Sequence, residues 1–292
     1  MVHYIENSEL KVGINHTGAE LCSIVSKKTR REYMWEGNEE IWGSTAPVLF
    51  PIIGSLKDNK YLYSGMEYYL PKHGFIRHNN QLKADVSQRN TLEFTYKFND
   101  ETLKMYPFKF EFSVLYKLEE NRIRVIHNVR NTGNEHMLFS LGGHPAFKCP
   151  FLDGERLTDY YIEFEEKENA PTWVLNAQGL LTNKTKKVLD NARKLPLTNN
   201  IFDEDALIFK NLKSRKVRLK SMLNAAEVVV RFHDFEYLGL WSKPGAPFVC
   251  IEPWLGVTDN ELTEHNFEQK EGVVSLAGNT DFCAEFSIEI HD

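Results

Sequence analysis

Apolar and polar residues alternate along several stretches of the chain. The clearest are residues 92–98, 110–118, 123–129, 217–219, 228–232 and 286–290. A period of two is typical of strands that have one buried face. Antiparallel sheets produce this alternation, whereas parallel α/β sheets give continuous apolar runs. The pattern therefore predicts an all-β protein, built as a large antiparallel β-sandwich.

Helical signals are scarce in this sequence. Only residues 37–42 and 199–207 have the composition to form single helical turns. Residues 242–247 are rich in Pro and Gly, which favours turns. We therefore predict a turn between two strands here, and not an interdomain linker. Length alone allows one or two domains. In the absence of a linker or an internal repeat, we interpret residues 1–292 as a single domain.

Charge and cysteine content narrow the function classes. The chain has 35 Lys+Arg and 41 Asp+Glu, giving a formal charge of −6, whereas nucleic-acid binders usually carry a basic surplus. No apolar stretch approaches the roughly 18 residues that a membrane span needs, and the N-terminus lacks a signal-peptide pattern. Four dispersed cysteines indicate free thiols in a reducing compartment. We predict a cytoplasmic protein that binds neither nucleic acids nor membranes.

Three segments place ionisable side chains beside Gly or Pro at expected strand ends: residues 70–78, 139–147 and 248–254. Functional side chains often lie at such positions, because the sheet holds the backbone while the side chain reaches a cleft. Glu252 follows an apolar Phe-Val-Cys-Ile run, where a lone carboxylate is costly unless it is paired or at a site. The alternative is that Pro253 ends the strand and Glu252 points to solvent. The pattern alone favours neither interpretation.

Two histidines and an arginine are further candidates. His144 follows two glycines, which allow a close backbone approach, although a core histidine bonded to a carbonyl would give the same pattern. His73 precedes another glycine. If its segment is extended, Arg77 lies on the same strand face as His73. An arginine and a histidine in one cleft suit recognition of hydroxyl, carboxylate or phosphate groups.

Common catalytic motifs are absent: the sequence has no nucleophile elbow, P-loop or dinucleotide-binding glycine pattern. By residue type alone, His73, His144 and Glu252 could also converge on a metal ion.

The three segments carry Pro-Lys-His-Gly-Phe-Ile-Arg at 71–77, Gly-His-Pro-Ala-Phe at 143–147 and Ile-Glu-Pro-Trp at 251–254. Together with residues 49–54 and 205–209, which occur in the same order, they resemble the aldose 1-epimerase (mutarotase) family and its bacterial LacX-like branch. The resemblance extends from about residue 10 to the end of the chain. It implies a large β-supersandwich, which agrees with the alternation.

The resemblance also implies an activity: interconversion of the α and β anomers of a free aldose, without a metal or an organic cofactor. It gives Glu252 the role of general base and His144 that of general acid. His73 would assist at the ring oxygen or the anomeric hydroxyl, Asp205 would hold sugar hydroxyls, and Arg77 would line the cleft. No feature of the sequence indicates an oligomeric state.

One loop departs from the family pattern. Many relatives carry Arg after the Pro-Ile-Ile-Gly segment, whereas this chain has Ser55 there and Lys57 two residues later. Lys57 is the candidate to replace that cation at the sugar. Trp241, Trp254 and Phe147 are rings that could stack on a sugar or fill the core.

Hemiacetal ring opening needs a base at the anomeric oxygen and an acid at the ring oxygen. A carboxylate and an imidazolium on opposite sides of the sugar can supply both. Ordinary pKa values near 4.3 for Glu and 6.5 for His predict a bell-shaped pH profile, with the acidic limb from Glu252 and the higher limb from His144.

Four other functions remain open at this stage. They are a non-catalytic sugar-binding sandwich, a metal-dependent sugar isomerase, a glycoside hydrolase using Asp205 and Glu252, and a hexose-6-phosphate epimerase with Arg77 and Lys57 at the phosphate.

Overall fold

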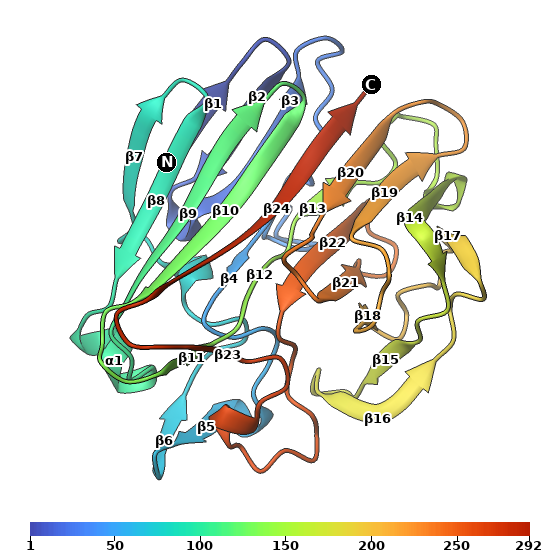
Figure 1. The fold of residues 1–292 in the computed structure, drawn as a ribbon. Helices are drawn as coiled ribbons and strands as arrows, with labels where there is room; N and C mark the ends of the chain where they lie inside the picture. Colours follow the sequence, from blue (N-terminus) through green and yellow to red (C-terminus); the bar gives the residue numbers. More distant parts are fainter.

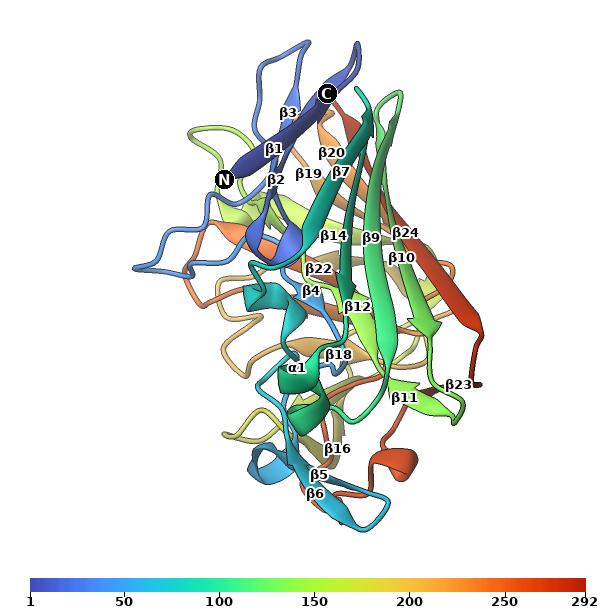
Figure 2. The same ribbon diagram turned by 90° about the vertical axis from the view of Figure 1, so that its left-hand side faces the viewer.

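Two large antiparallel sheets dominate the structure, a computed structural model that describes residues 1–292 (Figure 1). In spatial order, the nine-stranded sheet contains β17 (Ala192–Pro196), β14 (Tyr160–Glu168), β19 (Lys216–Ser221), β20 (Glu227–Arg231), β24 (Asp281–His291), β10 (Arg122–Asn131), β9 (Phe110–Glu119), β8 (Thr91–Lys97) and β7 (Lys83–Gln88). Figure 2 shows this sheet from its β7 edge.

The eight-stranded sheet includes the strand that carries Glu252. It contains β16 (Leu181–Lys186), β15 (Thr172–Leu175), β18 (Leu207–Phe209), β21 (Tyr237–Trp241), β22 (Phe248–Leu255), β12 (Leu141–Gly143) and β4 (Val48–Leu49), with β13 (Ala146–Lys148) also paired to β22. Because β12 and β13 pair with different parts of β22, a short connection crosses beside the middle of that strand.

Smaller elements surround the two sheets. The strands are β1 (Val2–Glu6), β2 (Leu10–Asn15) and β3 (Glu20–Ser26) in one sheet, β5 (Lys60–Tyr63) with β6 (Met66–Tyr69), and β11 (Met137–Phe139) with β23 (Val274–Leu276). The helices are α1 (Asp100–Met105) and five 3₁₀ turns: η1 (Thr17–Ala19), η2 (Lys57–Asn59), η3 (Ile76–His78), η4 (Leu157–Asp159) and η5 (Phe267–Gln269). None of these helices has the length and apolar character needed to span a bilayer.

The sequence-predicted strands correspond to β8, β9, β10, β19, β20 and β24, which confirms the all-β sandwich. Burial alternates along β10, whose Val125 and Val129 face the core between the large sheets. On β9, the neighbouring strand of the same sheet, Tyr116 is paired with Val125 and Phe112 with Val129. The apolar face of each strand is thus buried against the other layer. Residues 242–247 form the predicted turn between β21 and β22.

Helical structure is scarce, as the sequence predicts. Residues 37–42 and 199–207 contain turns but no helix, and the α-helix of the structure is α1. The Asn99 side chain accepts the backbone N–H groups of Glu101 and Thr102, and the Thr102 hydroxyl accepts the N–H of Asn99. This capping box stabilises a helix that is too short to show an apolar period of 3.6.

Candidate active site

Glu252 lies in the middle of β22, not at its end. It is opposite Gly239 of β21, and only 1% of its surface is exposed. The interpretation that Pro253 ends the strand is wrong, because β22 continues to Leu255. Ile251 donates its N–H to the Pro145 carbonyl in the connection between β12 and β13. The Pro253 nitrogen, two residues further on, faces the same break in pairing, so its missing N–H costs no ladder hydrogen bond.

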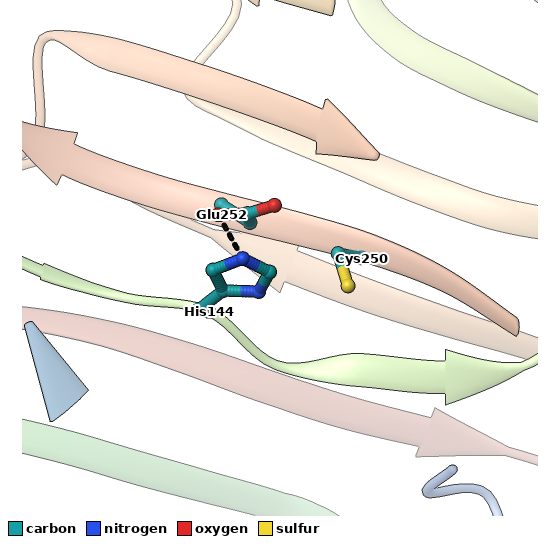
Figure 3. Close-up of side chains that lie close together, drawn as sticks. All are labelled: His144, Cys250 and Glu252. Carbon is teal, nitrogen blue, oxygen red and sulfur yellow. Dashed lines mark ion pairs between the residues drawn. The ribbon is translucent and has the colours of Figure 1, made fainter. Parts of the chain in front are cut away.

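His144 belongs to that connection and meets Glu252 there. Its Nε2 lies 3.1 Å from Oε2 of Glu252 (Figure 3). The two atoms are at ion-pair distance without an aligned hydrogen bond, since Oε2 is buried and has no hydrogen-bond partner. A Cβ on Gly143 would lie 2.7 Å from the Phe286 ring. The close backbone approach predicted for the glycines before His144 is therefore confirmed.

Aromatic rings hold His144 in place. Trp42 stacks on its imidazole with ring centroids 5.1 Å apart, while Trp241 and His73 present their rings edge-on at 5.8 and 5.7 Å. His144 is 9% exposed, so the ring is nearly enclosed. Sequence analysis missed Trp42, because it lies in an irregular loop and joins the others only through tertiary packing.

His73 is held in a turn, not in a strand. Positive φ angles at His73 (65°) and Gly74 (74°) reverse the backbone, and η3 follows. The predicted shared strand face with Arg77 is therefore wrong, although both residues reach the same cleft. Nδ1 of His73 accepts the Gly54 N–H at 3.1 Å. A neutral His73 ring must consequently carry its proton on Nε2, which has no partner in the protein.

All five residues singled out from the sequence line one cleft of about 460 Å³: His73, Arg77, His144, Asp205 and Glu252. Asp205 is exposed, and its Oδ1 accepts the N–H of Ala206 at 2.8 Å. The Arg77 guanidinium donates from Nη2 to the Ser44 hydroxyl at 3.3 Å, while its Nε is buried without a partner.

Burial shifts the pKa values of Glu252 and His144 in opposite directions. Desolvation raises the pKa of Glu252 well above its ordinary value; the Asp205 charge adds to this and Lys72 opposes it. Desolvation, helped by the charge on Arg77, lowers the pKa of His144 to about 3. Contact between Glu252 and His144 opposes both shifts, because each charged form stabilises the other. Between their two pKa values, the pair holds one proton in total.

The same burial keeps His73 neutral. Its pKa falls well below the ordinary value, chiefly through desolvation, with the His144 charge next in importance. His73 is therefore a fixed hydrogen-bond donor at neutral pH.

Comparison with known proteins identifies the family. Residues 1–273 match the family model described as aldose 1-epimerase. The chain belongs to the aldose 1-epimerase family. Over 281 residues it is 34% identical to a protein named "Protein LacX, plasmid" from Lactococcus lactis subsp. lactis, and the alignment covers 93% of each chain.

Solved structures of aldose 1-epimerase relatives share the whole fold. A galactose mutarotase related enzyme from Lactobacillus acidophilus is 37% identical, with a TM-score of 0.95, and the match covers 100% of this chain and 98% of that one. A galactose mutarotase-like protein from Lactobacillus casei is 29% identical with a TM-score of 0.93, and both chains are covered completely. The fold and a mutarotase-type function follow from this membership.

The remaining candidate residues divide between the cleft and other parts of the fold. Lys57 donates from Nζ to the Thr263 carbonyl at 3.2 Å, and neither it nor Ser55 lines the cleft. Phe147 is fully buried in the main core, whereas Trp241 and Trp254 do line the cleft. Lys72, the neighbour of His73, is a cleft residue that the sequence analysis left unassigned, although it lies inside the matched motif.

Proposed function

We propose that this chain is an aldose 1-epimerase that interconverts the α and β anomers of a free aldohexose, with Glu252 as base and His144 as acid. The observation that carries the proposal is the buried carboxylate of Glu252. Its Oε2 is buried and lies 3.1 Å from the His144 imidazole, and both residues line a cleft of about 460 Å³. Burying a carboxylate without a Lys or Arg partner lowers the stability of the folded protein. Such a group is therefore typical of a functional site.

The adjacency of the two groups fits the reaction. The anomeric oxygen and the ring oxygen of a pyranose are bonded to the same carbon, so base and acid must reach neighbouring atoms. At 3.1 Å, Glu252 and His144 are too close for a sugar ring to lie between them, so they would act from the same side of the sugar and not from opposite sides. A sugar entering the cleft would place its two oxygens against this pair.

The reaction then needs only proton transfers. In the form of the pair whose single proton is on His144, Glu252 removes the proton of the anomeric hydroxyl while His144 protonates the ring oxygen, and the bond between C1 and the ring oxygen breaks. The open-chain aldehyde rotates about C1–C2 and closes on its other face, returning both protons. Such an acid–base pair typically contributes about 10²–10⁴-fold to the rate. No metal or organic cofactor is required by this scheme.

The other cleft residues would bind and orient the sugar. Because Nδ1 of His73 accepts from Gly54, its Nε2–H is available to a sugar oxygen. The free Nε of Arg77 and the exposed carboxylate of Asp205 offer a donor and acceptors for hydroxyl groups. Trp241 and Trp254 supply apolar surface for the sugar ring.

A hexose 6-phosphate is a second candidate substrate. The observation that favours it is the presence of two cations, Lys72 and Arg77, on the cleft wall. We favour the neutral sugar, because Lys57 is engaged elsewhere and Asp203 and Asp205 line the same cleft.

The test is NMR exchange between anomers for a panel of free and 6-phosphorylated aldoses, with and without EDTA. We expect catalysed exchange of free aldoses that EDTA leaves unchanged. Sugar binding without exchange would instead indicate a sugar-binding sandwich, and loss of exchange in EDTA a metal-dependent isomerase. Cleavage of chromogenic glycosides would indicate a hydrolase.

A further inference from the structure

Cys250 lies next to the proposed catalytic pair. It precedes Glu252 by two residues on β22, so both side chains leave the same face of the strand (Figure 3). Its thiol is fully buried, and Cys250 is not among the residues that line the cleft. The acid–base scheme gives this thiol no role.

One ligand atom each from His144, Cys250 and Glu252 lie within 4.8 Å of one another. Imidazole nitrogen, thiolate sulfur and carboxylate oxygen are the ligands that zinc prefers, with bonds of roughly 2.0–2.3 Å. A tetrahedral ion with such bonds holds its ligand atoms roughly 3.5 Å apart. The 3.1 Å between His144 and Glu252 is close to this spacing, so small side-chain movements would complete the site.

A second observation points to a ligand at the same place. Oε2 of Glu252 is buried, has no hydrogen-bond partner, and belongs to a side chain that is 1% exposed. His144 and Glu252 also line the cleft, so an ion can enter from there. His73, which the sequence analysis grouped with them as a possible metal ligand, is not part of this cluster.

We propose that His144, Cys250 and Glu252 form an inhibitory binding site for a thiophilic divalent cation such as Zn²⁺ or Cd²⁺. The three side chains supply three ligands and leave the fourth position open to the cleft. On binding, the thiol of Cys250 releases its proton to solvent, the His144–Glu252 pair releases the one proton that it holds, and sulfur, nitrogen and oxygen coordinate the ion. The ion occupies the base and the acid at once, so anomer exchange stops. The inhibitory effect rests on the proposed function; binding of the ion does not.

Binding is measured first, with Cd²⁺ as the probe and the ultraviolet absorption of the cadmium–thiolate bond as the signal. The protein carries Cys283→Ala, because Cys283 is exposed and would add its own signal. We expect saturable absorption that Cys250→Ala and Cys250→Ser both remove. Cys149→Ala is the matched control, since Cys149 is a buried thiol outside the cluster. Unchanged absorption in both Cys250 variants would overturn the proposal.

Inhibition is measured next, with Zn²⁺ and each variant compared with its own anomer-exchange rate in EDTA. We expect the half-inhibiting Zn²⁺ concentration to rise at least tenfold in Cys250→Ala and to stay the same in Cys149→Ala. Equal sensitivity of these two variants would contradict the inhibitory site. If wild-type protein exchanges no anomers but shows the Cys250-dependent cadmium signal, the proposed function fails while the metal site stands.

Discussion

The imidazole of His144 and the carboxylate of Glu252 meet at 3.1 Å, although they come from distant parts of the sequence. Both are buried, and burial favours the neutral form of each. The pair is therefore a place where one proton is held between two groups of strongly altered pKa.

Replacing the carboxylate tests the base. We expect Glu252→Gln to reduce the anomer-exchange rate by about 10²-fold or more, because the amide keeps the shape but cannot accept the proton. Sugar binding should change little, as measured by calorimetry. Glu264→Gln, at an exposed position outside the cleft, is the control and should exchange anomers at the wild-type rate. Near wild-type turnover in Glu252→Gln would exclude Glu252 as the base.

The pH profile of the exchange rate should be a broad bell. His144 should give its acidic limb and Glu252 its alkaline limb, which is the reverse of what ordinary pKa values predict. Activity requires the pair to hold one proton. At low pH, activity is lost when the pair takes up a second proton on His144, whose pKa is about 3. At high pH, activity is lost when the pair loses its last proton, since the pKa of Glu252 is raised. We expect a plateau across pH 5–6 in a stopped-flow polarimetry series. An acidic limb near the ordinary pKa of glutamate would contradict this assignment.

The pH dependence of the free energy of unfolding tests the raised pKa of Glu252 without an activity assay. The folded-state pKa lies above the ordinary value of 4.5, so the stabilising contribution is complete below pH 4.5 and is lost as pH rises through the folded-state pKa. In that window, wild type should lose about 1.4 kcal/mol per pH unit relative to Glu252→Gln. Denaturant unfolding at several pH values measures this difference, and a difference that is constant with pH would show that the pKa is not raised.

Arg77 tests the choice between the two substrate classes. For a neutral sugar, Arg77→Ala should weaken binding by about 1–3 kcal/mol, equally for free and 6-phosphorylated aldoses, because a buried donor is lost. Salt should change this effect little. Lys57→Ala is the control, since Lys57 contacts the Thr263 carbonyl outside the cleft. A wild-type preference for 6-phosphates that Arg77→Ala abolishes would show that the cleft binds phosphate.

Local patterns in the sequence predict the sandwich and most strands of its nine-stranded sheet. Alternation of apolar and polar residues is a local property, and in β8, β9 and β10 it corresponds directly to burial on one face of a sheet. The short motifs around His73, His144 and Glu252 likewise marked residues that line one cleft. Each of these motifs contains an ionisable residue beside Gly or Pro, which can be read without knowing its partners.

How those residues are arranged relative to one another depends on the tertiary structure. Pro253 lies inside a strand because β12 and β13 leave a break in their pairing to β22, and no local pattern reveals a break between distant strands. Trp42 reaches His144, and His144 reaches Cys250 and Glu252, through packing of separate segments. The altered pKa values follow from the same packing. The burial of these side chains and the distances between them depend on contacts between residues far apart in the chain. They are therefore established only when the sheets have assembled.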